Sequence, residues 1–155
     1  MASTKDLDFL PGFNLEGFPN RDSTIYTGYY GLEEAVTVLR GTIRYKGFAE
    51  AARTLQFLGL LDPNPHSSLH DRGPDITWRR LICDLVGLED SNLLTDNLKR
   101  NITERAGSEY AVELLEDLEL LSDTNVKKAS TPLDTLTHYL STKLALGEYY
   151  RKHLM

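Results

Sequence analysis

The stretch from Leu15 to Phe48, LEGFPNRDSTIYTGYYGLEEAVTVLRGTIRYKGF, contains most of the features of this chain that ordinary core packing does not explain. Residues 18–24 (FPNRDST) combine a rigid proline with small polar residues, which is typical of a turn, and Arg21 places a cation inside it. Residues 35–45 (AVTVLRGTIRY) are rich in β-branched side chains and predict a β-strand. The stretch therefore predicts a turn followed by a strand, each carrying arginine.

One face of the predicted strand carries two arginines among the side chains Val36, Val38, Arg40, Thr42 and Arg44. Ionised arginine is costly to bury without a partner, so this face is not ordinary core. Arg40 and Arg44 would lie about 13 Å apart along a strand, and Gly41 between them often marks close approach of a ligand or another backbone. Either the two arginines pair with Asp22, Glu33 or Glu34 on a solvated face, or they bind a multiply charged anion. The pattern alone favours the ion-paired interpretation.

Composition narrows the class of protein. The chain has 155 residues, 41% hydrophobic and 26% charged, which is typical of one soluble globular domain with a real core. The net charge of −6 argues against nucleic acid as a partner, and no run approaches the ~20 apolar residues of a membrane span. Cys83 is the single cysteine and lies in an apolar context, so we expect a buried, inert thiol. No metal site is predicted, and no targeting segment is recognisable.

The fold class predicted from the pattern is α+β, mainly helical, with a short β part at the N-terminus followed by about five helices. Apolar side chains recur at helical spacing in the ranges 48–58, 78–86, 94–106, 110–121 and 132–146. Thr77 and Thr131 are the expected N-caps of the second and fifth of these helices. We divide the chain into a β part, residues 1–46, and a helical part, residues 47–155. Such a small sheet is expected to belong to a larger one.

The segments 7–48, 77–87 (TWRRLICDLVG) and 132–136 (PLDTL) also resemble a known family. They are similar to saccharopine dehydrogenase, most closely the form that is fused into the animal bifunctional α-aminoadipic semialdehyde synthase of lysine degradation. The resemblance implies that residues 1–46 are part of a substrate-binding α/β domain and that residues 47–155 are a helical insertion domain. It also implies a mitochondrial location, as in the animal family.

The resemblance further implies a ligand. The family oxidises saccharopine with NAD and water to glutamate and α-aminoadipic semialdehyde, and saccharopine carries three carboxylates that suit an arginine-rich site. By position, Arg21, Thr42 and Arg44 match substrate-binding residues of the family, and Ile43 matches a contact made through the backbone. With the resemblance included, we interpret Arg21 and Arg44 as part of a site for saccharopine or a related carboxylate. No catalytic residue can be assigned.

The chain departs from the family in one respect that bears on activity. It contains no G-x-G-x-x-G motif, the fingerprint of a dinucleotide-binding Rossmann domain. We therefore expect that NAD or NADP binds in the complete enzyme, that none binds to this chain alone, and that a Rossmann domain is supplied in cis or in trans. The complete enzyme could also be a homodimer. The alternative is a non-catalytic helical interaction module derived from the family, in which Arg21 and Arg44 are dispensable.

Overall fold

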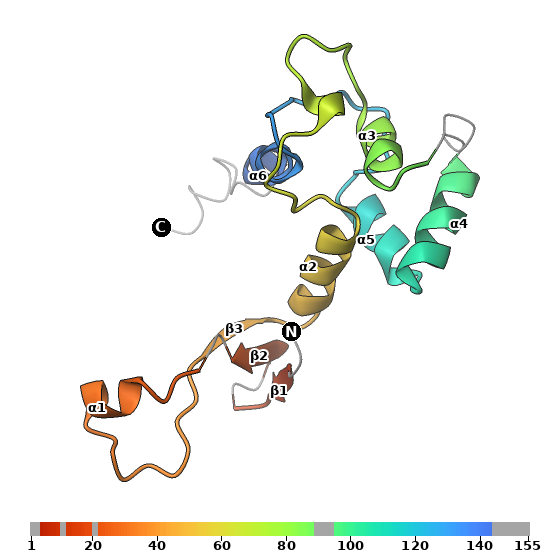
Figure 1. Ribbon diagram of the computed structural model, residues 1–155. Helices are drawn as coiled ribbons and strands as arrows, with labels where there is room; N and C mark the ends of the chain where they lie inside the picture. Colours follow the sequence, from red (N-terminus) through yellow and green to blue (C-terminus); the bar gives the residue numbers. More distant parts are fainter. Residues whose placement is uncertain (1–3, 10–11, 20–21, 89–94, 144–155) are drawn as a thin grey trace, which may run out of the picture. The chain divides into compact units, whose positions relative to one another are not determined.

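The computed structural model describes residues 4–9, 12–19, 22–88 and 95–143. The chain divides into two compact units, residues 1–52, here called the sheet unit, and residues 53–155, here called the helical unit. The boundary falls within the helix α2 (Phe48–Phe57). Strands occur in the sheet unit and the long helices follow them, so the predicted α+β class is confirmed (Figure 1).

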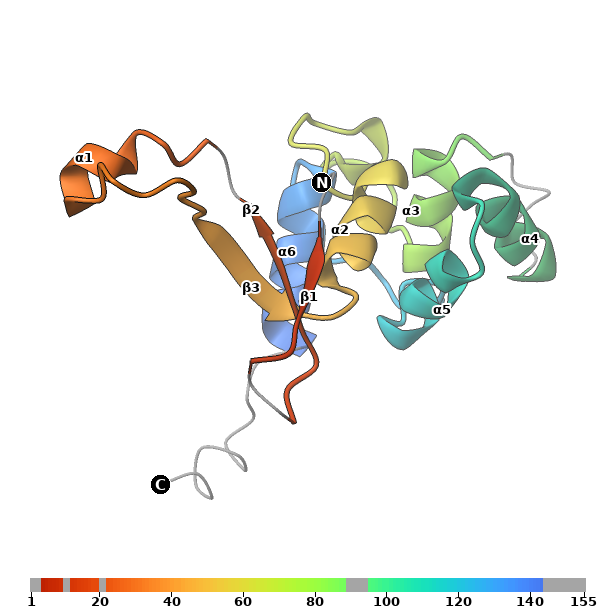
Figure 2. The same cartoon turned by 90° about the horizontal axis from the view of Figure 1, so that it is seen from below.

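The sheet has three short antiparallel strands in the order β1-β2-β3 (Figure 2). They are β1 (Lys5–Leu7), β2 (Leu15–Pro19) and β3 (Gly41–Tyr45). The central strand β2 pairs with both neighbours, and its Glu16 lies opposite Asp6 of β1 and Arg44 of β3. Residues directly opposite each other in an antiparallel pair share a face, so this register decides which side chains can meet.

The strand predicted over residues 35–45 is wrong in its first half, because β3 begins only at Gly41. Gly41 lies opposite Pro19, the last residue of β2, and proline has no N–H with which to continue a ladder. A Cβ at Gly41 would lie 2.8 Å from the carbonyl oxygen of Phe18, so only glycine lets the two backbones approach this closely. The close approach expected at Gly41 is therefore that of another backbone.

Between β2 and β3 the chain makes a long excursion that carries α1 (Tyr26–Tyr30), a helix the sequence does not predict (Figure 2). It ends at Gly31 in a left-handed conformation with φ of 63°. The rings of Tyr26 and Tyr30 stack with centroids 5.8 Å apart, whereas Tyr29 is 81% exposed. Tyrosines at spacing i and i+4 can stack on one helix face, which is a local reason for this single turn.

The helical unit contains the later part of α2 and four further helices, and all five predicted helices exist. The four are α3 (Trp78–Leu85), α4 (Thr95–Ala106), α5 (Tyr110–Asp117) and α6 (Pro132–Lys143), with a 3-10 turn at Ser67–Leu69. The helix predicted over 110–121 ends earlier, at Asp117, because Glu119 adopts a left-handed φ of 58°. The predicted helix positions 94 and 144–146 lie outside the described residues.

Both predicted N-caps are confirmed. The Thr77 side chain accepts a hydrogen bond from the backbone N–H of Arg80, at 3.3 Å. The Thr131 hydroxyl accepts from the N–H of Asp134 at 3.0 Å and donates to the Asp134 carboxylate at 2.8 Å. Each hydroxyl satisfies an N–H that the first turn of a helix leaves without a partner.

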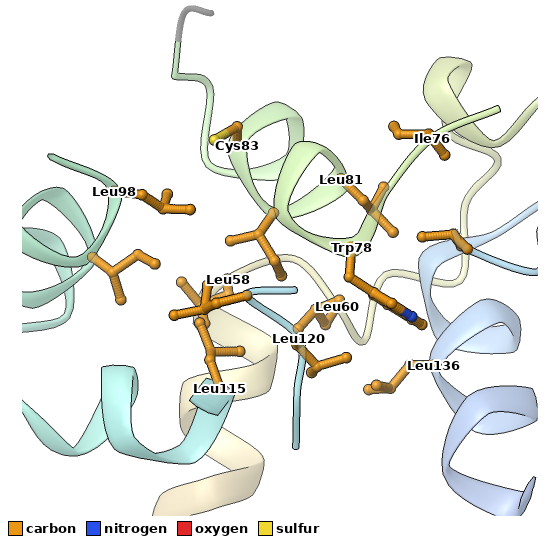
Figure 3. Close-up of a cluster of buried hydrophobic side chains, with 14 of the residues drawn as sticks. Leu58, Leu60, Ile76, Trp78, Leu81, Cys83, Leu98, Leu115, Leu120 and Leu136 are labelled. Carbon is orange, nitrogen blue, oxygen red and sulfur yellow. The ribbon is translucent and has the colours of Figure 1, made fainter. Parts of the chain in front are cut away.

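The core of the helical unit gathers side chains from every helix from α2 to α6 and from the turns between them (Figure 3). Trp78 of α3 is 1% exposed and reaches toward Leu60 and Leu136, while its ring lies 4.8 Å from that of Tyr139. The predicted inert Cys83 is buried in the same cluster. The core members are Leu58, Leu60, Leu69, Ile76, Trp78, Leu81, Ile82, Cys83, Leu98, Ile102, Ala111, Leu115, Leu120, Leu121, Val126 and Leu136.

The long connection between α2 and α3 is held by several contacts, among them the buried side chain of Leu69, a hydrogen bond from the Ser68 hydroxyl to the Asp84 carboxylate, and a lysine from later in the chain. The ammonium group of Lys128 donates to the backbone carbonyls of His70, Gly73 and Pro74, at 3.3, 3.1 and 2.7 Å. A lysine ammonium has three N–H donors, so these carbonyls use its full capacity. The connection is therefore held in place without secondary structure of its own beyond one 3-10 turn.

Candidate anion-binding site

The sheet register separates the predicted site residues. Arg44 lies opposite Glu16, and Thr42 lies opposite Phe18, so these side chains share one face of the sheet. Ile43 projects from the other face, where it is 48% exposed. The fourth predicted residue, Arg21, lies outside the described residues. The described part of the site therefore consists of Thr42 and Arg44 on one face, with the backbone of Ile43 between them.

Arg44 is held by its neighbours and keeps free donor capacity. Its guanidinium carbon lies 5.4 Å from the ring centroid of Phe48, at the start of α2, and one Nη donates to the carbonyl of Ile43 at 2.8 Å. Across the described ranges, Arg44 forms no ion pair with a carboxylate. A guanidinium has five N–H donors, so an incoming anion can still take two of them.

Arg40 does not accompany Arg44 on the strand, because it precedes β3. Its guanidinium lies 4.8 Å from the ring centroid of Tyr26 and donates to the hydroxyl oxygen of Tyr26 at 2.7 Å. Arg40 thus fastens α1 to the chain that enters β3. The ion-paired interpretation, with Asp22, Glu33 or Glu34 as partners, is wrong for both arginines within the described residues.

Glu16 was not singled out from the sequence. It is only 6% exposed, and its carboxylate accepts a hydrogen bond from the backbone N–H of Ala49 at 2.9 Å. Ala49 is the second residue of α2, where N–H groups have no helical partner and a negative charge is favoured. The available signal is an acidic residue within an otherwise apolar short strand, but its partner depends on the tertiary fold.

A second cation near the end of β3 is already neutralised. Lys46 forms an ion pair with Asp6 of β1, with Nζ and Oδ2 2.8 Å apart. The hydrogen bond to Asp6, followed by the charge of Asp6, raises the pKa of Lys46 above the ordinary lysine value. Arg44 is therefore the cation at this end of the strand whose charge the described carboxylates do not take up.

A pocket of about 560 Å³ lies in the sheet unit, but it is not lined by Arg44. Its wall is mainly apolar, with Lys5 and Arg40 as the charged members. The lining residues are Lys5, Leu7, Phe9, Gly17, Phe18, Pro19, Leu39, Arg40, Gly41, Thr42 and Ile43. Two of the predicted site residues, Thr42 and Ile43, therefore line this hollow, whereas Arg44 does not.

The turn that follows Arg21 is organised by Asp22. One carboxylate oxygen of Asp22 accepts from the backbone N–H of Thr24 at 3.0 Å and from its hydroxyl at 2.8 Å. The backbone bond first, and then the hydroxyl bond, lower the pKa of Asp22 below the ordinary aspartate value. Because the folded pKa is lower than the unfolded one, this turn is stabilised above the unfolded pKa and loses that stabilisation as pH falls through the folded pKa.

We expect Thr24→Val to move the pKa of Asp22 part of the way back toward its ordinary value, because valine keeps the backbone N–H and removes the hydroxyl. The measurement is an NMR pH titration of the Asp22 side-chain carboxyl carbon in both proteins. Thr27→Val, which removes a hydroxyl bonded to the carbonyl of Thr24 instead, is the matched control and should leave the titration unchanged. Identical titrations of Asp22 in the wild-type and Thr24→Val proteins would contradict the assignment.

The two histidines of the connection between α2 and α3 have structural roles. The Nδ1 atoms of His66 and His70 accept the backbone N–H groups of Ser68 and Arg72, at 3.3 and 3.1 Å. Within the part of the chain that the structure describes, no three His, Cys, Asp or Glu side chains are grouped as metal ligands. Over the same residues, no helix has the length and apolarity needed to cross a membrane.

Comparison with known proteins gives consistent matches. The family described as "Saccharopine dehydrogenase C-terminal domain" matches residues 1–155. The mitochondrial alpha-aminoadipic semialdehyde synthase of Bos taurus is 42% identical over 148 residues, which are 95% of this chain and 16% of that protein. The NADP(+), L-glutamate-forming saccharopine dehydrogenase of Schizosaccharomyces pombe is 29% identical over 160 residues, which are 100% of this chain and 35% of that protein.

A solved structure has a similar fold. Apo saccharopine dehydrogenase (L-Glu forming) from Saccharomyces cerevisiae superimposes with a TM-score of 0.78 at 28% sequence identity. The superposition covers 91% of this chain and 32% of the yeast chain. The chain therefore spans about a third or less of the length of these relatives.

Proposed function

Because the chain belongs to the saccharopine dehydrogenase C-terminal domain family, we propose that it forms the carboxylate-binding part of a saccharopine dehydrogenase. In this proposal Arg44 contacts one carboxylate of saccharopine. The reaction that the complete enzyme would perform is the oxidation of saccharopine with a nicotinamide cofactor and water to glutamate and α-aminoadipic semialdehyde. Support comes from the family match over the whole chain and from relatives whose names state saccharopine dehydrogenase.

The single observation that carries the proposal is the state of Arg44. Its guanidinium is exposed, rests on the Phe48 ring, and forms no ion pair in the described residues. An arginine held in this way has lost part of its side-chain freedom before any ligand arrives, so less entropy is lost on binding. Its unused donors suit the bidentate geometry of a carboxylate.

The other predicted contacts are placed around Arg44 in this proposal. Thr42 lies two residues away on the same face, where its hydroxyl could contact the same ligand. Ile43 would act through its backbone, and its carbonyl already orients the Arg44 guanidinium. Arg21, which precedes Asp22 in the sequence, would supply the second cation that a tricarboxylate needs.

The cofactor is assigned to the rest of the longer enzyme. A Rossmann site needs parallel strands with a glycine-rich turn leading into a helix, whereas the three described strands are all antiparallel. The described residues therefore do not fit NAD or NADP, and we expect this chain alone to show no dehydrogenase activity. This chain covers 16% of the bovine protein, so 84% of that protein lies outside the match. A cofactor domain would lie in that remaining part, supplied to this chain in cis or in trans.

The same proposal names the two parts of the chain and their setting. Residues 1–46 would belong to the substrate-binding domain, and residues 47–155 would be the helical insertion. The names of the bovine and rat relatives place those proteins in the mitochondrion, and we propose the same location here. A homodimer of the complete enzyme is part of the proposal.

We expect Arg44→Ala to weaken saccharopine binding by about 10-fold to 100-fold, the usual effect of losing a hydrogen-bonded charge pair. Arg44→Lys keeps the charge but cannot form the bidentate hydrogen bonds of a guanidinium with a carboxylate. Its affinity for saccharopine should therefore lie between those of the wild type and the alanine variant. Binding is followed by NMR titration of the full chain, which detects weak complexes. Arg100→Ala removes the same charge from an exposed position of α4 and is the matched control.

Two results would count against the proposal. Equal affinities of the wild type and Arg44→Ala would favour the alternative of a non-catalytic helical module that has kept the fold of the family. Turnover of saccharopine by the purified chain with NAD or NADP would contradict the assignment of the cofactor to another part of the enzyme.

A further inference from the structure

We infer that Glu16 is a positioning residue for Arg44, acting through the first turn of α2 and the ring of Phe48. This inference rests on the proposed function, since it concerns the residue that would contact a substrate carboxylate. Glu16 itself is 6% exposed and need not touch the ligand. Three relations within the sheet unit carry the inference.

The first relation joins β2 to α2. The Glu16 carboxylate accepts the backbone N–H of Ala49 at 2.9 Å, in a buried position. Between β3 and α2 the chain has only Lys46 and Gly47, and Gly47 has a left-handed φ of 95°. The first turn of α2 is therefore positioned by a tight turn and by a hydrogen bond to a strand residue that precedes Ala49 by 33 positions.

The second relation joins α2 to Arg44. Phe48 immediately precedes Ala49, so fixing the N–H of Ala49 also fixes the backbone that carries the Phe48 ring. That ring lies 5.4 Å from the guanidinium carbon of Arg44. The ring covers one face of the guanidinium, which restricts the directions in which its N–H donors can point.

The third relation is the register of the sheet. Glu16 and Arg44 are directly opposite each other on β2 and β3, on the same face. The charged neighbours on this face and at its edge are Asp6, opposite Glu16 on β1, and Lys46, which is paired with Asp6. Lys46 is paired with Asp6, and the carboxylate of Glu16 instead accepts the N–H at the N-terminus of α2, beside Arg44.

The hydrogen bond, rather than the negative charge, is the element that positions the ring. Glu16→Gln keeps an oxygen that can accept the Ala49 N–H, whereas Glu16→Ala removes it. Phe48→Leu leaves the Glu16–Ala49 bond in place and removes only the ring. Asp6→Asn removes a negative charge from the same sheet face without touching either contact, and it is the control.

The test is NMR of the full chain, with the Nε–H signals of arginine observed before and during titration with saccharopine. In Glu16→Ala and in Phe48→Leu, we expect the Arg44 signal to shift and to report a more mobile side chain. In both variants the affinity for saccharopine should fall by about 2-fold to 5-fold, the loss expected for a cation–π contact at an exposed site. Glu16→Gln and Asp6→Asn should keep the wild-type Arg44 signal and affinity.

The outcomes separate this inference from the proposed function. An unchanged Arg44 signal in Glu16→Ala overturns the inference, and so does Glu16→Gln behaving like Glu16→Ala. If Glu16→Ala does not fold, an unchanged Arg44 signal in Phe48→Leu overturns it equally. If the Arg44 signal responds as expected but Arg44→Ala binds saccharopine as the wild type does, the positioning role stands and the proposed ligand contact is wrong.

Discussion

Trp78→Ala is expected to lower the free energy of unfolding of the helical unit by about 3–5 kcal/mol, the range for removing a large aromatic side chain from a core. Trp78 is 1% exposed and follows the N-cap of α3, so its backbone is fixed by the cap and its ring by the core. The deletion also removes the ring contact with Tyr139, whose hydroxyl donates to the carbonyl of Leu118 at 2.8 Å. The cavity would therefore open where α3, α6 and the end of α5 meet.

Urea unfolding followed by circular dichroism measures this loss, because Trp78 is the single tryptophan and its fluorescence disappears in the variant. Trp78→Phe keeps an aromatic ring in place and should cost clearly less. Phe57→Ala, at a position that is 57% exposed in α2, is the control for an aromatic deletion outside the core. If Trp78→Ala lowered the free energy of unfolding by less than about 1 kcal/mol, the conclusion that this ring is a main part of the core would be contradicted.

Thr135→Val is expected to cost about 2–3 kcal/mol, although the two side chains have almost the same shape. Thr135 is 1% exposed, and its hydroxyl both accepts from the N–H of Ala129 at 3.0 Å and donates to the carbonyl of Ala129 at 2.8 Å. The Thr135 hydroxyl thus forms hydrogen bonds with both the backbone N–H and the backbone carbonyl of Ala129. Valine would leave both without their partner in a part-buried position.

The same urea experiment compares Thr135→Val with Thr135→Ser. Serine keeps the hydroxyl and loses only a methyl group, so it should cost about 1 kcal/mol. If the hydroxyl matters more than the methyl group, Thr135→Val should lose more stability than Thr135→Ser. If only packing mattered, Thr135→Ser would lose more. A valine variant as stable as the wild type would show that water replaces the lost hydrogen bonds.

The helices could be predicted from the sequence because their signals are local. Thr77 and Thr131 are N-caps whose partners lie three residues away, and the stripe through Trp78, Leu81 and Ile82 repeats at helical spacing. The early end of α5 could not be predicted in this way. It depends on a left-handed Glu119, and the apolar pattern continues past it because Leu120 and Leu121 are buried in the turn that follows.

The candidate site was less predictable because its partners are distant in the sequence. The strand pattern around Arg44 was visible, and the resemblance pointed to Thr42, Ile43 and Arg44 together. The contact between Arg40 and Tyr26 spans 14 residues, and that between Glu16 and Ala49 spans 33. Such contacts depend on the register of the sheet and the direction of a helix. The spacing of residues in the sequence does not predict either of them. The start of β3 at Gly41 likewise depends on its pairing with Pro19.

The three carbonyls that converge on Lys128 have a consequence for the surroundings in which this fold can persist. Carbonyl groups gathered in this way commonly hold a cation taken from solution, such as calcium. Here the positive charge is part of the polypeptide, so the carbonyls of His70, Gly73 and Pro74 are bound by a covalently attached group that cannot diffuse away. Because no metal ion from solution takes part in these contacts, removing calcium with a chelator should leave them in place.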